Sequence, residues 1–117
     1  MTIKQKICRA IVYCSIQNKP LLYISGKVSD LPADEVRSKF TGAEKHYSEM
    51  GFAIFNPTKW LSPDEDWQEA MKLCTAVLPM CDNVVLLHDW ADSKGAIAER
   101  GQALLLGIPT IENYEPF

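Results

Sequence analysis

Ser93, Gly95 and Glu99 have the spacing of a ligand site at the start of a helix. Backbone N–H groups in the first turn of a helix lack partners within the helix, and the helix dipole is positive there, so the position binds anions. Ser93 adds a hydroxyl group, and Gly95 lets a ligand approach the backbone closely. The pattern alone leaves an equal alternative, in which Ser93 only caps the helix and Gly95 only eases packing.

Glu99 lies one turn beyond Gly95, so its side chain is expected to point back toward the strand ends. The positive end of the helix favours the carboxylate form, which a nucleophile requires. The alternative is a solvated glutamate that compensates the dipole and pairs with Lys94 or Arg100.

Four short apolar runs, separated by helical patterns, predict the sheet that must position these residues. Continuous apolar runs are typical of strands that are covered on both faces, as in a parallel sheet. The runs are 21–24, 52–55, 84–87 and a weaker 108–111, in which Pro109 favours a sheet edge. We therefore expect an α/β fold, a small doubly wound (flavodoxin- or Rossmann-like) parallel sheet with strand order 2-1-3-4 and helices on both faces.

The segments between the runs predict three helices. The first carries an apolar stripe and ends at Gly51, and the last follows Ser93 and ends at Gly107. The middle helix should begin at 62–65, where Ser-Pro-Asp-Glu has the form of a capping box with proline in the first turn. Its inner face would contain Trp67, Ala70, Met71, Cys74 and Leu78.

Residues 1–19 stand outside this alternation. We divide the chain into an N-terminal amphipathic extension, 1–19, and an α/β domain, 20–117. The extension would form a helix that packs on the domain or on a second subunit, and its apolar face would contain Ile3, Ile7, Ala10, Ile11 and Cys14. This face and the small core predict a homo-oligomer.

In an open parallel sheet, ligands bind beyond the carboxyl ends of the strands, at the point where the strand order reverses. By this rule, three segments that follow strands should lie at the same pocket as the start of the last helix. The residues that they bring to the expected pocket are Ser25, Gly26, Lys27, Asn56, Asp89 and Trp90.

Composition excludes several classes of protein. The 117 residues, 47% of them hydrophobic, suit one domain with its own core, and the net charge is −3. Lysine and arginine form no block, so we expect no nucleic acid polymer as a partner. No apolar run approaches the roughly 20 residues of a membrane span. The first residues lack a signal-peptide pattern, and we expect a cytoplasmic protein.

The four cysteines do not form a Cys-x-x-Cys pair, and both histidines lie far from them in the sequence. We interpret Cys8, Cys14, Cys74 and Cys81 as small buried hydrophobic residues. A redox or metal-binding role for them is a weaker alternative. We expect no metal and no tightly held cofactor.

Four motifs, taken in order and spacing, resemble the nucleoside 2-deoxyribosyltransferase superfamily, and most of all a bacterial and phage branch of unknown function. They are the stretches 23–26 (YISG), 51–57 (GFAIFNP), 81–87 (CDNVVLL) and 93–99 (SKGAIAE). The resemblance extends from about Leu21 to Ile111.

The resemblance implies a nucleoside or nucleoside 5′-monophosphate as ligand, and cleavage of its N-glycosidic bond or transfer of its deoxyribosyl group. In that superfamily the glutamate that matches Glu99 attacks the anomeric carbon, and water or another base resolves the glycosyl-enzyme intermediate. The tyrosine that matches Tyr23 lies beside it. A serine at the position of Ser93 binds phosphate in the branch that hydrolyses deoxynucleoside 5′-monophosphates, so Gly95 and Ala96 would lie at the phosphate too.

One departure from the superfamily bears on catalysis. Its enzymes usually carry an aspartate eight residues before the position of Asp82, and this chain has Cys74 there. The nearest acids, Glu69 and Asp66, lie one and two turns back. The alternative to an enzyme is therefore a non-catalytic nucleotide-binding module of the same fold with a regulatory role. We interpret Asp82 itself as structural.

Overall fold

The computed structural model describes residues 1–113 and contains one four-stranded parallel sheet within them. Its strand order is β2-β1-β3-β4, which confirms the predicted α/β fold and its order. The strands are β1 (Leu21–Ser25), β2 (Ala53–Phe55), β3 (Asn83–Leu86) and β4 (Thr110–Glu112). The weak fourth run lies at an edge, as Pro109 indicated.

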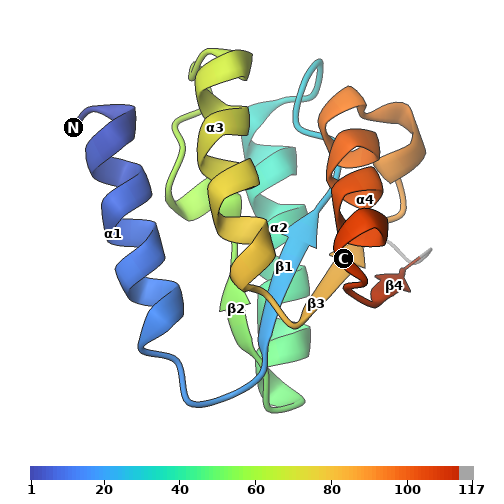
Figure 1. Ribbon diagram of the computed structural model, residues 1–117. Helices are drawn as coiled ribbons and strands as arrows, with labels where there is room; N and C mark the ends of the chain where they lie inside the picture. Colours follow the sequence, from blue (N-terminus) through green and yellow to red (C-terminus); the bar gives the residue numbers. More distant parts are fainter. Residues whose placement is uncertain (114–117) are drawn as a thin grey trace.

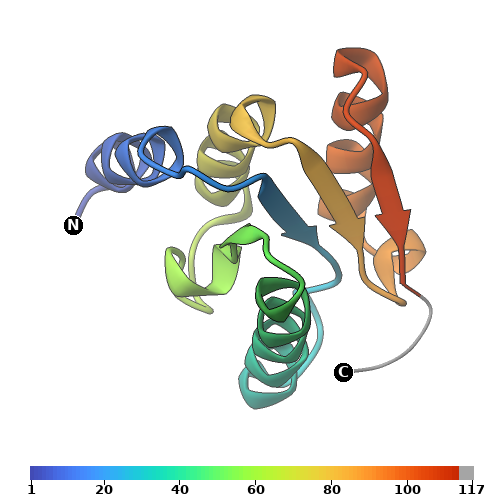
Figure 2. The same cartoon turned by 90° about the horizontal axis from the view of Figure 1, so that it is seen from below.

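Helices cover both faces of the sheet (Figures 1 and 2). The helices are α1 (Ile3–Ser15), α2 (Ala33–Glu49), α3 (Trp67–Val77) and α4 (Lys94–Leu106), with short 3-10 turns at Pro57–Lys59, Leu78–Met80 and Trp90–Asp92. Figure 2 shows α1, α3 and α4 on one face of the sheet and α2 on the other.

Strand β1 supplies both halves of the core because successive side chains of a strand point to opposite faces. Leu21 and Tyr23 belong to the apolar cluster beneath α1, α3 and α4. Leu22 and Ile24 belong to the cluster beneath α2. The continuous apolar run thus reflects a strand that is buried on both faces.

Asp82 has the structural role that the sequence indicated. Its Oδ2 accepts a hydrogen bond of 2.7 Å from the backbone N–H of Leu21, where β1 begins. The carboxylate therefore satisfies a donor at the amino end of the sheet, opposite the end where the strands finish.

Helix α1 packs on α3 within the same chain, as Figure 1 shows. Ala10 and Cys14 are buried, Ile3 and Ile7 contact the core, and Ile11 is partly exposed. The apolar face that suggested a second subunit is therefore used inside the chain. The homo-oligomer stays a prediction and would need another surface.

The start of α3 differs from the prediction. Residues 62–65 form a turn in which the Ser62 hydroxyl donates to the Glu65 carboxylate at 3.0 Å, and the Glu65 N–H donates to the Ser62 carbonyl. The helix begins at Trp67, and its cap is Asp66, whose carboxylate accepts from the Glu69 N–H. The contacts between Ser62 and Glu65 therefore close a turn, and they do not cap the start of a helix.

The inner face of α3 agrees only in part, since Cys74 and Leu78 are buried as predicted but Trp67 is not. Its buried residues are Leu73, Cys74 and Val77, whereas Trp67 is 41% exposed. Trp67, Ala70 and Met71, which the sequence assigned to the core, line a cavity instead. Three of the four cysteines are buried, as predicted, but Cys8 is exposed.

None of the helices within residues 1–113 has the length and apolar character needed to cross a membrane.

Alanine substitutions at two glycines should have opposite effects on stability. A methyl group at Gly26 would lie 2.9 Å from Leu87 Cδ1 and 3.0 Å from its Cβ, whereas one at Gly101 meets nothing within 4 Å. We expect Gly26→Ala to lower the free energy of unfolding by about 1–3 kcal/mol through overpacking. Gly101→Ala should raise it by about 0.5–1 kcal/mol, because alanine is the better helix former. Urea denaturation measures both, and equal effects would contradict the close packing at Gly26.

Candidate functional site

A cavity of about 630 Å³ lies at the carboxyl ends of the strands. Its walls come from the loop after β1, the segment Pro57–Glu65, one face of α3 and the first turns of α4. This volume lies within the usual range for sites that hold small ligands. The position agrees with the rule for open parallel sheets.

Glu99 lines the cavity from α4 and is only 6% exposed. The Tyr23 hydroxyl donates to Oε2, and the Ser25 hydroxyl donates to Oε1 at 2.7 Å. The alternative of a solvated glutamate is therefore wrong. Lys94 instead stacks over the ring of Trp67, and Arg100 over that of Trp90.

Local structure explains how the three groups meet. Tyr23 and Ser25 are two residues apart on β1, so both point to the face that α4 covers. The buried face of α4 contains Ala96, Glu99 and Ala103. The two alanines let the helix lie close to the sheet, and the carboxylate reaches the two hydroxyl groups.

Burial raises the pKa of Glu99 above its ordinary value of 4.5, although hydrogen bonds from Tyr23, Ser25 and Cys74 oppose that effect. The sequence predicted the opposite direction, from the helix dipole. The dipole acts within the first turn, and Glu99 lies beyond it, so desolvation decides the direction.

Cys74 is the third neighbour of the carboxylate and also lines the cavity. Burial, together with the nearby Glu99 carboxylate, raises the pKa of the Cys74 thiol well above its ordinary value. Burial likewise raises the pKa of Tyr23. Both groups keep their protons at neutral pH and act as donors rather than as nucleophiles.

The start of α4 also lines the cavity. The Ser93 hydroxyl accepts from the Ala96 N–H at 3.1 Å, so Ser93 does cap the helix. Among residues 1–113, the N–H groups of Lys94 and Gly95 have no backbone or side-chain acceptor. A methyl group at Gly95 would lie 3.5 Å from Met71 Sδ and 3.6 Å from Trp67 Nε1. The backbone of Gly95 therefore faces these two side chains of α3.

A buried ion pair holds the loop after β1. Lys39, on α2 and 5% exposed, donates to Asp89 Oδ2 at 2.5 Å and to the carbonyl of Lys27 at 2.7 Å. Asp89 Oδ1 accepts from the Lys27 N–H. Burial alone would raise the pKa of Asp89, but the hydrogen bonds from Lys39 and Lys27 outweigh it and lower the pKa.

Most of the residues predicted for the site meet at the cavity. Those that line it are Tyr23, Gly26, Lys27, Ser93, Gly95, Ala96 and Glu99. Ser25 lies behind Glu99 and touches it, although it does not line the cavity itself.

Three predicted residues have other positions. Asn56 is buried and caps the turn Pro57–Lys59 through a hydrogen bond from the Thr58 N–H. Asp89 holds the loop from outside the cavity, and Trp90 packs against the core. All three follow strands as predicted, but their side chains bind the protein rather than face the cavity.

Lys39 was not predicted for the site, and Trp67 and Met71 line the cavity although their positions on α3 had predicted a core role. Lys39 follows Val36 by three residues and so falls on the apolar stripe of α2. A lysine on an apolar stripe signals a buried charge that needs a partner. Within residues 1–113, no group of three or more His, Cys, Asp or Glu side chains is placed to hold a metal ion.

The raised pKa of Glu99 predicts how stability depends on pH. Because the pKa is higher in the folded state, the protonated form contributes stability below pH 4.5, and this contribution is lost as pH rises through the folded-state pKa. The free energy of unfolding of the wild type, minus that of Glu99→Gln, should therefore fall as pH rises above 4.5. Each unit by which folding raises the pKa of Glu99 corresponds to about 1.4 kcal/mol of this difference.

Urea denaturation over this pH range measures the difference. Glu49→Gln is the matched control, because it makes the same substitution at an exposed glutamate of α2. A difference that grows with pH for Glu99→Gln would show that hydrogen bonding outweighs burial.

Comparison with known proteins places the chain in a family. No curated protein and no solved structure matches it. A family model, described as a domain of unknown function (DUF4406), matches residues 20–112. The match includes the whole sheet, every strand end at the cavity and Glu99, and leaves out helix α1. With that share of its residues matched, the chain belongs to the DUF4406 family of domains of unknown function.

Proposed function

We propose that this protein binds a nucleoside 5′-monophosphate and cleaves its N-glycosidic bond, with Glu99 as the nucleophile. The observation that carries the proposal is a buried carboxylate that lines a cavity and has a hydroxyl donor on each oxygen. Hydroxyl donors on both oxygens hold the carboxylate in one orientation, which is what attack on a single carbon atom requires. Perturbed carboxylates in cavities are frequent at catalytic sites.

The start of α4 supports an anionic ligand, because the N–H groups of Lys94 and Gly95 have no acceptor among the described residues. Lys27 and Lys94 line the cavity, and so do the acids Asp30, Glu65, Asp92 and Glu99, so the phosphate is assigned to the helix start and not to the net charge of the lining. The Ser93 hydroxyl can accept from the Ala96 N–H and still donate its own hydrogen to a phosphate oxygen. The resemblance to deoxynucleoside 5′-monophosphate N-glycosidases agrees with this assignment.

The reaction consists of two displacements. A carboxylate oxygen of Glu99 bonds to the anomeric carbon, and the electrons of the C–N bond leave with the base, which takes up a proton. Water then attacks the same carbon and loses a proton, which balances the proton taken up by the base; the glycosyl ester bond breaks, and the Glu99 carboxylate is regenerated. Another base in place of water gives deoxyribosyl transfer.

The second candidate is a module that binds the nucleotide without cleaving it. Cys74 favours it, because a thiol stands where the superfamily has a carboxyl group and its pKa is raised by burial. Such a thiol is a poor substitute for an acid that handles the leaving base. Binding of monophosphates without base release would establish this second function.

Replacing Glu99 by glutamine separates chemistry from binding. Glu99→Gln should abolish release of the free base, by at least about a thousandfold, because an amide of nearly the same shape cannot act as the nucleophile. Ligand binding, measured as thermal stabilisation by a panel of nucleosides and nucleoside 5′-monophosphates, should persist. Glu49→Gln serves as control and should keep both properties. Base release that survives Glu99→Gln would overturn the assignment.

The next prediction concerns the phosphate. Ser93→Ala removes one hydrogen bond to a charged group, worth about 1.5–3 kcal/mol, so the preference for monophosphates over nucleosides should fall about ten- to a hundredfold. Loss of the helix cap lowers stability by about 1 kcal/mol as well. Thr2→Ala, which removes the cap of α1, is the matched control and should lower stability without changing the preference. Equal weakening of nucleosides and nucleotides in Ser93→Ala would mean that Ser93 acts only as a cap.

A further inference from the structure

The segment Pro57–Glu65 forms one wall of the cavity, and we call it the cavity wall. Pro57, Leu61 and Glu65 all line the cavity, yet the segment contains only one short 3-10 turn. Its backbone hydrogen bonds, from Lys59, Trp60, Leu61 and Glu65, run to acceptors within residues 56–62, so side chains from other elements must fix its position.

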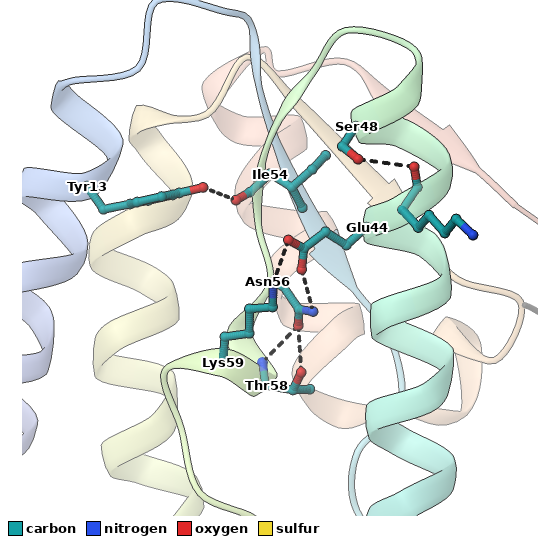
Figure 3. Close-up of polar contacts among 8 residues, drawn as sticks. Tyr13, Glu44, Ser48, Ile54, Asn56, Thr58 and Lys59 are labelled. Atoms are coloured by element: carbon teal, nitrogen blue, oxygen red, sulfur yellow. Dashed lines mark hydrogen bonds and ion pairs between the residues drawn. The ribbon is translucent and has the colours of Figure 1, made fainter.

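Helix α2 holds the first part of the wall, as Figure 3 shows. Glu44 accepts from the Asn56 amide at 3.0 Å and from the Lys59 ammonium at 2.8 Å. Asn56 in turn accepts from the backbone and the hydroxyl group of Thr58. These contacts all lie within the region that the family model covers.

Helix α1 holds the remainder, although it lies outside the family match. Lys6 donates to Glu65 at 3.0 Å, and the two side chains are only 17% and 21% exposed. Tyr13 donates to the carbonyl of Ile54 at 2.6 Å (Figure 3), and its ring lies 5.6 Å from that of Trp60. The helix thus contacts the wall at both Trp60 and Glu65.

The aromatic contacts continue from the wall to the carboxylate. Trp60 stacks on Phe55 at 5.7 Å between ring centroids, and Phe55 stacks on Tyr23 at 5.6 Å. Tyr23 donates its hydroxyl hydrogen to Glu99. A continuous row of rings therefore joins α1 to the buried carboxylate.

We propose that α1 is a positioning element of the cavity, in which Lys6 and Tyr13 hold the cavity wall against the α3 and α4 sides that carry Cys74 and Glu99. Both are positioning residues, since neither lines the cavity. The proposal holds for any ligand and does not require the proposed reaction.

The cysteines of the chain report on this arrangement without any ligand. Cys74 lines the cavity but is only 5% exposed, so a reagent reaches its sulfur atom only when the groups packed around it move apart. Cys14 and Cys81 are buried outside the cavity, and Cys8 is exposed on α1. The rate of alkylation of each cysteine by N-ethylmaleimide, read by mass spectrometry on the full chain, separates opening of the cavity from loosening of the core.

We expect the double variant Lys6→Met, Tyr13→Phe to accelerate alkylation of Cys74 about five- to tenfold, because the wall opens locally more often. The rates at Cys8, Cys14 and Cys81 should stay unchanged. Lys6→Arg should retain the wild-type rate, because it keeps the ion pair. Lys4→Met removes the same charge from an exposed position of the same helix, and it should have no effect.

An unchanged rate at Cys74 in the double variant would overturn the proposal. So would an equal acceleration at Cys14 and Cys81, because α1 would then only stabilise the fold. The same acceleration in Lys4→Met would also overturn it, since the effect would come from net charge alone.

Discussion

The burial of the Glu99 carboxylate is the constraint on which the site depends. A carboxylate that leaves water needs hydrogen-bond donors in compensation, and here Tyr23 and Ser25 supply them from β1. The two hydroxyl groups reach Glu99 because they share one face of the strand. The carboxylate reaches them because Ala96 and Ala103 let α4 lie close to the sheet. Strand, helix and carboxylate thus determine one another's positions. Loss of either hydroxyl group leaves one carboxylate oxygen without its donor, and loss of the Glu99 side chain leaves both hydroxyl groups without this acceptor.

Ion pairs hold the two irregular segments that complete the cavity. Lys39 and Asp89 bind both backbone groups of Lys27 and so fix the loop after β1. Glu44, from α2, and Lys6, from α1, bind the opposite wall. Partly buried pairs of this kind cost desolvation energy, and their contribution to stability alone is small. What they contribute here is geometry, because loops without regular hydrogen bonding otherwise sample many conformations.

The same environment sets limits on chemistry. Burial raises the pKa of Glu99 and so makes its carboxylate a stronger base than an ordinary glutamate, while the donors from Tyr23 and Ser25 oppose that rise and hold the carboxylate in one orientation. Cys74 adds a third proton donor but no negative charge. An N-glycosidase of this design would rely on binding energy at the phosphate and on orientation of the nucleophile. A binding module would need only the cavity and its cations.

Local patterns in the sequence determined the four strands and the helix start at Ser93, because apolar runs, caps and glycines act over a few residues. The strand order followed from general rules of chain connection, and the contact of Asp82 with Leu21 joins residues far apart in the chain. Other features depended on residues far apart in the chain. Residues 62–65 form a turn whose Glu65 pairs with Lys6 of α1, and the helix begins later; Asn56 and Asp89 bind Glu44 and Lys39 rather than facing the cavity. The direction of the Glu99 pKa also followed from tertiary structure. Burial and partners come from segments that only folding brings together, and desolvation there outweighs the local helix dipole.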